Sequence, residues 1–140
     1  MNRCYFVIAV GFMLLISACT SVPSSNCGTV ASYKVPSEQD DLYPVMLTHI
    51  DGVAIVAQAN YHLTLGHHKI TMVELVSAPG WDFPLKYRGK KTIDIDVQQG
   101  MRYHFAAKFN RFVSNPVRSD DFWLPVIWKQ EPLSCREGSI

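Results

Sequence analysis

Short runs of alternating apolar and polar residues, separated by turn-forming residues, are the feature that most constrains how this chain can fold. The alternation has a period of two, and no stretch after residue 30 repeats with the period of an amphipathic helix. The pattern predicts an all-β fold, an antiparallel β-sandwich of about seven or eight strands. The expected strands are 30–35, 45–50, 53–57, 59–64, 69–76, 92–97, 102–109 and 122–128.

The residues between these runs predict turns and loops. Residues 36–44 are polar and form a loop with at most one helical turn. The run 69–76 is apolar on both faces, which places it in the middle of a sheet. Pro125 cannot donate to a ladder, so the last strand lies at an edge or contains a bulge. Turns are expected at Asp51-Gly52, Leu65-Gly66, Pro79-Gly80, Gly89, Gly100 and Asn115-Pro116.

Two pairs of consecutive strands are predicted to form hairpins. A three-residue loop, 98–100, joins the strands of 92–109, with Gly100 in the left-handed conformation. The strands of 59–76 turn at Leu65-Gly66 and admit two registers. The expected cross-strand pairs are Asp96 with Arg102, Asp94 with His104, and Tyr61 with either Ile70 or Met72.

Residues 1–18 have the layout of a secretory signal peptide. Arg3 precedes an apolar run of about twelve residues, whereas a membrane-spanning helix needs roughly 20. The run ends in Leu15-Ile16-Ser17-Ala18-Cys19, which resembles the lipobox of bacterial lipoproteins. The resemblance implies cleavage before Cys19 and acyl chains on it. Thr20 after the cysteine implies the outer rather than the inner membrane, facing the periplasm. A signal peptide without lipid, or an uncleaved anchor, is the alternative.

The expected organisation is a signal peptide at 1–18, a lipidated tether at 19–29 and a β-sandwich domain at 30–140. Cys27 and Cys135 remain as a lone pair in an oxidising compartment, which favours a disulfide. A disulfide that closes a loop of about 100 residues would stabilise the folded state by up to roughly 4.7 kcal/mol in the chain-entropy model. Two buried thiols or a metal pair are the alternatives.

Composition and motifs argue against several classes of function. A formal net charge of +1, spread along the chain, argues against a nucleic-acid binder, because neutralising phosphates needs clustered Lys and Arg. The chain has no GxSxG motif and no glycine-rich phosphate loop. We therefore expect a non-enzymatic protein without a cofactor.

Three segments together resemble a known family. They are Ile50-Asp51-Gly52, the stretch Tyr61–Ile70, and Gln99–Phe105. This pattern is similar to small sandwich domains related to transthyretin and the carboxypeptidase-regulatory fold, found in uncharacterised proteobacterial lipoproteins. The resemblance implies an accessory or binding module and transfers no catalytic residue. Leu65 stands where that pattern has proline.

Five histidines raise the alternative of a periplasmic copper- or zinc-handling lipoprotein. The adjacent pair His67 and His68 should point to opposite faces of a strand, and His62 and His104 fall on expected outer faces. No HxH or HExxH spacing is present. The candidate ligands of this alternative are His62, His67, His68 and His104, with His49 the fifth histidine.

The connection 78–91 is rich in aromatic and basic residues. Aromatic side chains on a loop can form a contact platform or fold back over the core. Trp123 and Trp128 are five residues apart and should face opposite sides of their strand. The candidate binding surface is Trp81, Phe83, Tyr87 and Trp123. The sequence thus predicts an envelope accessory module that contacts an envelope protein or polymer and is held at the membrane by lipid.

Overall fold

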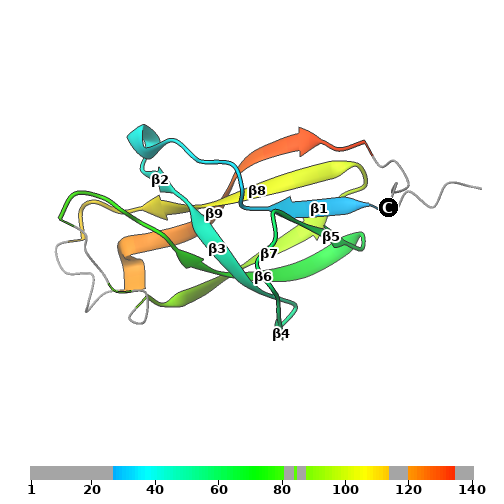
Figure 1. Ribbon diagram of the computed structural model, residues 1–140, viewed down its shortest axis with the longest axis horizontal. Helices are drawn as coiled ribbons and strands as arrows, with labels where there is room; N and C mark the ends of the chain where they lie inside the picture. Colours follow the sequence, from blue (N-terminus) through cyan, green and yellow to red (C-terminus); the bar gives the residue numbers. More distant parts are fainter. Residues whose placement is uncertain (1–26, 81–83, 85–87, 114–119, 135–140) are drawn as a thin grey trace, which may run out of the picture.

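Two β-sheets face each other across one hydrophobic core and form a β-sandwich (Figure 1). The structure is a computed structural model that describes residues 27–80, 84, 88–113 and 120–134. Within these residues it has nine strands and two 3-10 helices and no α-helix, which confirms the predicted all-β sandwich. No helix in this part of the chain is long and apolar enough to cross a membrane.

The first sheet is built around β8 (Met101–Phe109). β9 (Trp123–Pro132) pairs antiparallel with one edge of β8 along its whole length. The other edge is shared by β1 (Gly28–Ala31) and β2 (Leu42–Tyr43), and β5 (Asn60–Leu63) lies beside β1. β1 runs parallel to β8, so this sheet is mixed rather than wholly antiparallel as expected.

The second sheet is antiparallel, in the order β4 (Val53–Ala54), β3 (Val45–Ile50), β6 (Gly66–Glu74) and β7 (Lys90–Val97). β3 has the predicted bounds. β6 lies in the middle of the sheet, as its two apolar faces indicated. β3 and β4 are joined at Asp51 and Gly52, whose φ values of 52° and 80° fit a two-residue hairpin turn.

The remaining described elements are short. The 3-10 helix η1 (Glu38–Asp40) and β2 both lie within the predicted polar loop 36–44. The 3-10 helix η3 (Asp120–Phe122) directly precedes β9. β9 is an edge strand, as Pro125 predicted. A register shift opposite His104 and Phe105 leaves Trp128 as the extra residue of a β-bulge.

The predicted hairpin over 92–109 is wrong, because its two strands lie in different sheets. β7 pairs with β6, so that Asp96 lies opposite His67, whereas β8 pairs with β9, so that Arg102 lies opposite Glu131. Gly100 has the expected left-handed conformation, with a φ of 69°. The loop therefore carries the chain from one sheet to the other, and the two apolar faces meet across the core instead of side by side.

The predicted hairpin over 59–76 is wrong for the same reason. Tyr61 on β5 pairs with Val30 of the first sheet, and Ile70 on β6 pairs with Ile50 and Ile93 of the second. Neither of the two expected registers exists. In both segments the alternation predicted strands, but it did not distinguish a hairpin from a connection between sheets.

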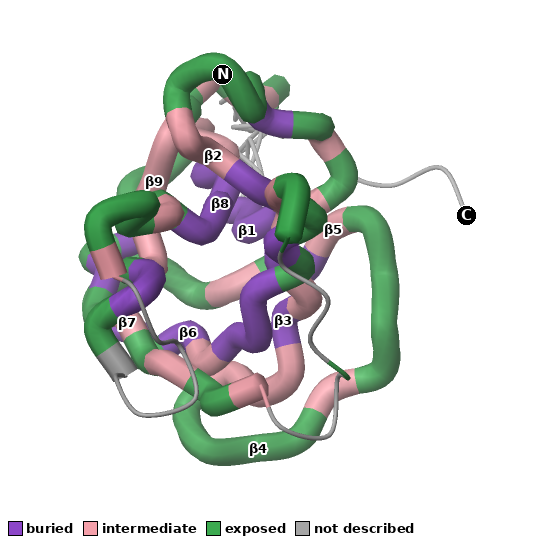
Figure 2. Tube along the Cα trace, turned by 90° about the vertical axis from the view of Figure 1, so that its left-hand side faces the viewer, coloured by how far each residue is buried: buried purple, intermediate pink, exposed green. Residues whose placement is uncertain are grey.

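The core lies between the two sheets, where the buried segments of the strands face inward (Figure 2). β8 is buried on both faces from Tyr103 to Ala107, as befits the central strand of its sheet. β7 instead alternates strictly between exposed and less exposed residues, and both of its aspartates are exposed. The buried core residues are Val30, Tyr43, Val45, Leu47, Tyr61, Ile70, Met72, Val76, Ile95, Val97, Tyr103, Phe105, Ala107, Phe122 and Trp123.

The two ends of the sandwich bring different segments of the chain together. At one end, which we call the tether pole, the Gly100 N–H donates to the Cys27 carbonyl at 2.9 Å, and the Leu133 N–H donates to the Gly100 carbonyl at 2.7 Å. The packing there is close, because a Cβ added to Gly28 would lie 2.0 Å from a methyl group of Val97.

The opposite end, the distal pole, lies beyond the last residue of β8. It is roughly 27 Å away by the rise of a nine-residue strand. Figure 1 shows β1 beginning and β9 ending at the same side of the molecule. The described ends of the domain thus lie together at the tether pole, and residues 110–113, which directly follow β8, lie at the distal pole.

Candidate functional site

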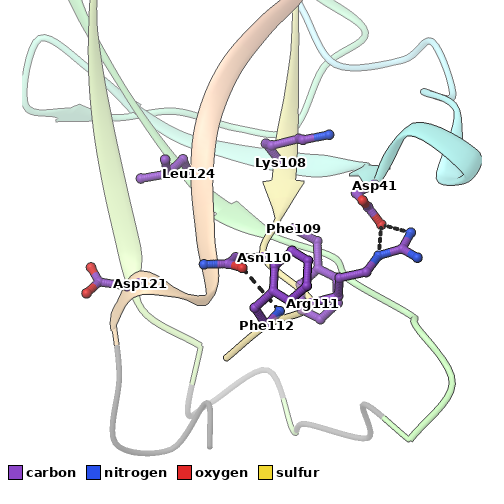
Figure 3. A pocket seen from close by; sticks show the side chains of 8 residues that line it. All are labelled: Asp41, Lys108, Phe109, Asn110, Arg111, Phe112, Asp121 and Leu124. Carbon is purple, nitrogen blue, oxygen red and sulfur yellow. Dashed lines mark hydrogen bonds and ion pairs between the residues drawn. The ribbon is translucent and has the colours of Figure 1, made fainter. Parts of the chain in front are cut away.

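A pocket of about 410 Å³ opens at the distal pole, between the end of β8 and the start of β9 (Figure 3). Its volume is in the range of pockets that bind small molecules or side chains. Its lining combines exposed apolar side chains with groups of both charges. The lining residues are Asp41, Lys108, Phe109, Asn110, Arg111, Phe112, Asp121 and Leu124.

Asn110 shapes the turn that follows β8. Its backbone N–H donates to the Phe122 carbonyl at 2.7 Å, and its side-chain oxygen accepts from the Phe112 N–H at 3.1 Å. An Asn side chain that bonds to the backbone two residues on is a common turn device. The turn leaves the ring of Phe112 92% exposed, and Leu124 at the start of β9 is 58% exposed. Two apolar side chains therefore stand in solvent beside the pocket.

Asp41 and Arg111 form an ion pair on the pocket wall (Figure 3). Asp41 adopts a left-handed conformation with a φ of 58°, directly after η1. Arg111 donates from Nε to Asp41 Oδ1 at 2.8 Å and from Nη2 to the same oxygen. The hydrogen bond to Asp41 raises the pKa of Arg111. Because the Phe109 N–H also donates to the Asp41 carbonyl, Asp41 links η1 to the end of β8.

A buried ion pair lies at the end of β6, on the same side of the fold. Glu74 is fully buried, and its Oε2 accepts from the Val76 N–H at 2.7 Å and from Arg88 Nη1 at 2.8 Å. Burial raises the pKa of Glu74, although these hydrogen bonds and the charge of Arg88 oppose the rise. Arg88 lies in the connection 78–91, directly after Tyr87. The ion pair therefore fixes this part of the connection to the second sheet.

The predicted binding surface is tested only in part. Trp81, Phe83 and Tyr87 lie outside the described residues. Trp123 was expected at the surface, but it is completely buried in the core, so that prediction is wrong. Trp123 lies opposite Phe109 at the inward face of the first sheet. Trp128, five residues on, is half-buried on the outer face, which confirms the predicted opposition of the two indoles.

The histidines are dispersed rather than gathered. His67 is exposed and His68 is buried, so the adjacent pair faces opposite sides as predicted. His62 is exposed, but His104, expected at the outer surface, is completely buried. No group of three His, Cys, Asp or Glu side chains within the described residues is arranged to hold a metal ion. A histidine-based metal site therefore gains no support from this geometry.

His68 holds two connections together instead. Its Nδ1 lies 2.7 Å from Asp51 Oδ2, and its Nε2 lies 2.9 Å from the Thr64 carbonyl. Both nitrogens thus face acceptors, which favours the doubly protonated ring. Burial lowers the pKa of His68, but the hydrogen bonds to Asp51 and Thr64 outweigh it and raise the pKa overall. The contact ties the β3–β4 turn to the connection before β6.

The cysteines are only partly described. Cys19, the predicted lipidation site, and Cys135 lie outside the described residues, and Cys27 directly precedes β1. No pattern in the sequence indicated Phe112, Arg111 and Leu124, which the structure brings together at the pocket. Residues 110–112 carry no spacing motif, and only the turn preference of Asn110 could have suggested that the next residues are exposed.

Neither a family model nor a curated protein nor a solved structure matches this chain. The fold and the pocket define it as a small β-sandwich with a mixed apolar and charged pocket at one end of its strands.

Proposed function

We propose that this chain is a non-enzymatic accessory module of the bacterial cell envelope, anchored by lipid at Cys19 and facing the periplasm. Its role is to bind an envelope protein or polymer through the pocket at the distal pole. The outer membrane is the proposed site of anchorage, from the resemblance of residues 15–19 to a lipobox.

The relation of the two poles supports this proposal. A tether that begins at Cys19 joins the domain at Cys27, which lies at the tether pole beside Gly100 and Leu133. A lipid on Cys19 would place that pole toward the membrane. The opposite pole, with the pocket, would then be the part of the domain most accessible to partners in the periplasm.

The exposure of Phe112 is the observation that carries the proposal. A phenylalanine that is 92% exposed adds nothing to the core, and its backbone is held in place by the bond to Asn110. Aromatic side chains at the centre of an interface, with charged groups around them, are typical contact anchors. Leu124 and the Asp41–Arg111 pair supply the apolar neighbour and the charged rim.

A disulfide between Cys27 and Cys135 is part of the proposal. The bonds through Gly100 bring Cys27 and Leu133 to the same end of the first sheet, and Leu133 is two residues before Cys135. A bridge there would close the domain at the pole where the tether joins it. The likeness to transthyretin-related sandwich domains is also proposed, and the two-sheet architecture supports it.

Capture of partners from envelope extract tests the contact surface. The wild-type protein is compared with Phe112→Ala and Leu124→Ala, and Val56→Ala is the matched control because Val56 is 79% exposed and does not line the pocket. We expect each pocket variant to lose the captured partner, while the control retains it. Equal capture by all four proteins would exclude the pocket as the contact surface.

Mass spectrometry of the protein purified from membranes tests the anchor. The expected product begins at Cys19, carries acyl chains and shows the two-hydrogen mass loss of one disulfide. An unacylated product in the membrane fraction would contradict the lipoprotein assignment. Replacement of Cys19 by Ala should release the protein into the soluble envelope fraction.

A further inference from the structure

A second polar cluster lies on the outer face of the first sheet, centred on Glu131 of β9. Glu131 Oε2 accepts from Lys34 Nζ at 2.6 Å, and Oε1 accepts from His104 Nε2 at 2.9 Å and from Arg102 Nη1 at 3.3 Å. Lys129 Nζ lies 3.9 Å from Oε2. Lys34, Arg102 and Lys129 therefore place three positive charges around the one carboxylate of Glu131. The cluster has a surplus of positive charge. We call it the Glu131 cluster, with Tyr33 and Trp128 included.

Aromatic rings cover this cluster. The Tyr33 ring packs edge-on against His104 at 5.2 Å between centroids, and the Trp128 ring lies 6.3 Å from His104. The bulge at Trp128 brings both this residue and Lys129 beside His104. As a result, His104 is completely buried although it lies on the outer face of its sheet.

Three buried nitrogens in this cluster have no hydrogen-bond partner anywhere in the described chain. They are Arg102 Nε, His104 Nδ1 and Trp128 Nε1. The first and third carry hydrogen and can only donate. An unsatisfied buried donor costs about 1–3 kcal/mol, and native proteins contain few of them. Donors of this kind beside a surplus of positive charge are groups that a negatively charged acceptor would satisfy.

We propose that the Glu131 cluster binds a small oxyanion, a phosphate or carboxylate group, on Arg102 Nε and Trp128 Nε1 beneath Tyr33. Arg102 would contribute charge and direction, because a guanidinium presents fixed donors to an oxyanion. Lys129, which is 42% exposed, would add charge at the entrance. The site is separate from the pocket and does not rest on the proposed function.

Tyr33 is the side chain that controls access. It is 45% exposed, and its hydroxyl accepts from Arg102 Nη1 at 3.2 Å. It lies in the connection between β1 and η1, where the backbone is in neither sheet. Rotation of this ring would uncover His104 and Arg102 without breaking any ladder of the sheet.

Calorimetric titration of inorganic phosphate into the detergent-solubilised mature protein tests the site. We expect saturable binding to the wild type and about tenfold weaker binding to Trp128→Phe, which keeps a ring and removes one donor to an anion. Trp123→Phe is the matched control, since it also removes a buried, unpartnered indole N–H but in the core. Thermal unfolding of each variant verifies that it is folded.

Lys129→Gln provides a second test, on a side chain that is 42% exposed. It should weaken phosphate binding two- to fivefold and reduce the salt dependence, whereas Lys90→Gln on the second sheet should change neither. No saturable binding to the wild type would mean that water satisfies the three nitrogens, and it would overturn the proposal. Equal affinities of Trp128→Phe and Trp123→Phe would overturn it as well.

Vesicles identify the source of the oxyanion once phosphate binding is established. Phosphatidylglycerol vesicles that compete with inorganic phosphate for the Cys19→Ala protein, when phosphatidylcholine vesicles do not, would assign the site to a lipid headgroup. Phosphate binding without such competition would assign it to a free anion. Both results require that Trp128→Phe loses the response.

Discussion

The outer faces of the two sheets carry similar histidine–carboxylate contacts with opposite exposure. On the second sheet, His67 Nε2 lies 3.1 Å from Asp94 Oδ1, and the two side chains are 58% and 59% exposed. On the first sheet, His104 Nε2 lies 2.9 Å from Glu131 Oε1, and the His104 side chain is 1% exposed. The two distances are nearly equal, so the contacts differ in exposure and not in length.

The two histidines differ in exposure because different residues cover them. Tyr33 and the bulge at Trp128 exclude water from His104, whereas His67 lies near the exposed start of β6. Water weakens an ion pair and allows its partners to separate at little cost, while a covered pair cannot exchange its partners for solvent. The contacts of the covered face should therefore contribute measurably to stability, and those of the open face should contribute almost nothing.

The same substitution on both faces gives the largest expected effect. His104→Ala should lower the free energy of unfolding by about 3 kcal/mol, because it leaves a cavity and removes one donor from Glu131. His67→Ala should change it by less than about 0.5 kcal/mol. Urea denaturation of both variants at neutral pH measures the two values. Equal losses would refute the role assigned to coverage.

Lowering the pH should reduce the stability of the fold through Glu131 on the covered face of the first sheet. The hydrogen bonds from Lys34 and His104 lower the pKa of Glu131 from 4.5 to about 2. A lowered pKa contributes stability that is present above pH 4.5 and is lost as the pH falls toward about 2. Glu131→Gln should be less stable than the wild type at pH 7, and the difference should shrink steadily across that window. A difference that does not depend on pH would contradict this assignment.

His68 is buried on β6 but bonds to Asp51 at the β3–β4 turn, so we expect an intermediate effect with the opposite pH dependence. Its pKa is raised in the folded state, so its contribution is complete below the unfolded value of 6.5 and is lost as the pH rises above the folded value. Asp51→Asn should cost about 1 kcal/mol at pH 6. The cost should be smaller at pH 8.5, as thermal unfolding at the two pH values would measure. A larger cost at the higher pH would contradict the assigned protonation.

The smallest effect is expected for Asp94→Asn on the open face. The contact with His67 is exposed and weakened by salt, so the change in unfolding free energy should stay below about 0.5 kcal/mol. The residual effect should disappear at about 1 M salt. A loss that persists at high salt would show that this face is not as open as its exposure indicates.

The sequence predicted the layers of this fold better than its connections. The alternation in 92–97 and the bounds of β3 are local properties of the chain, and both are confirmed. Whether two consecutive strands pair or cross to opposite sheets depends on partners far away in sequence. Tyr61 pairs with Val30 of β1, whereas the next strand, β6, pairs with β3 and β7. The residues around Tyr61 could not indicate so distant a partner.

The sites were harder to predict than the fold for a related reason. His104 occupies an outward position by alternation, and only the distant Tyr33 and the bulge at Trp128 make it buried. Trp123 was expected at the surface because Pro125 marks an edge strand, yet an edge strand still has an inward face. Phe112 is exposed through a turn that no motif distinguishes.

Photo-crosslinking in living cells tests the central claim, that the distal pole is the contact surface, most directly. A benzophenone amino acid at position 112 should give a discrete crosslinked product with an envelope component, because it replaces an exposed ring of similar shape. The same amino acid at position 56, where Val56 is 79% exposed but lies outside the pocket, should give none. A product at position 56 and none at position 112 would contradict the account.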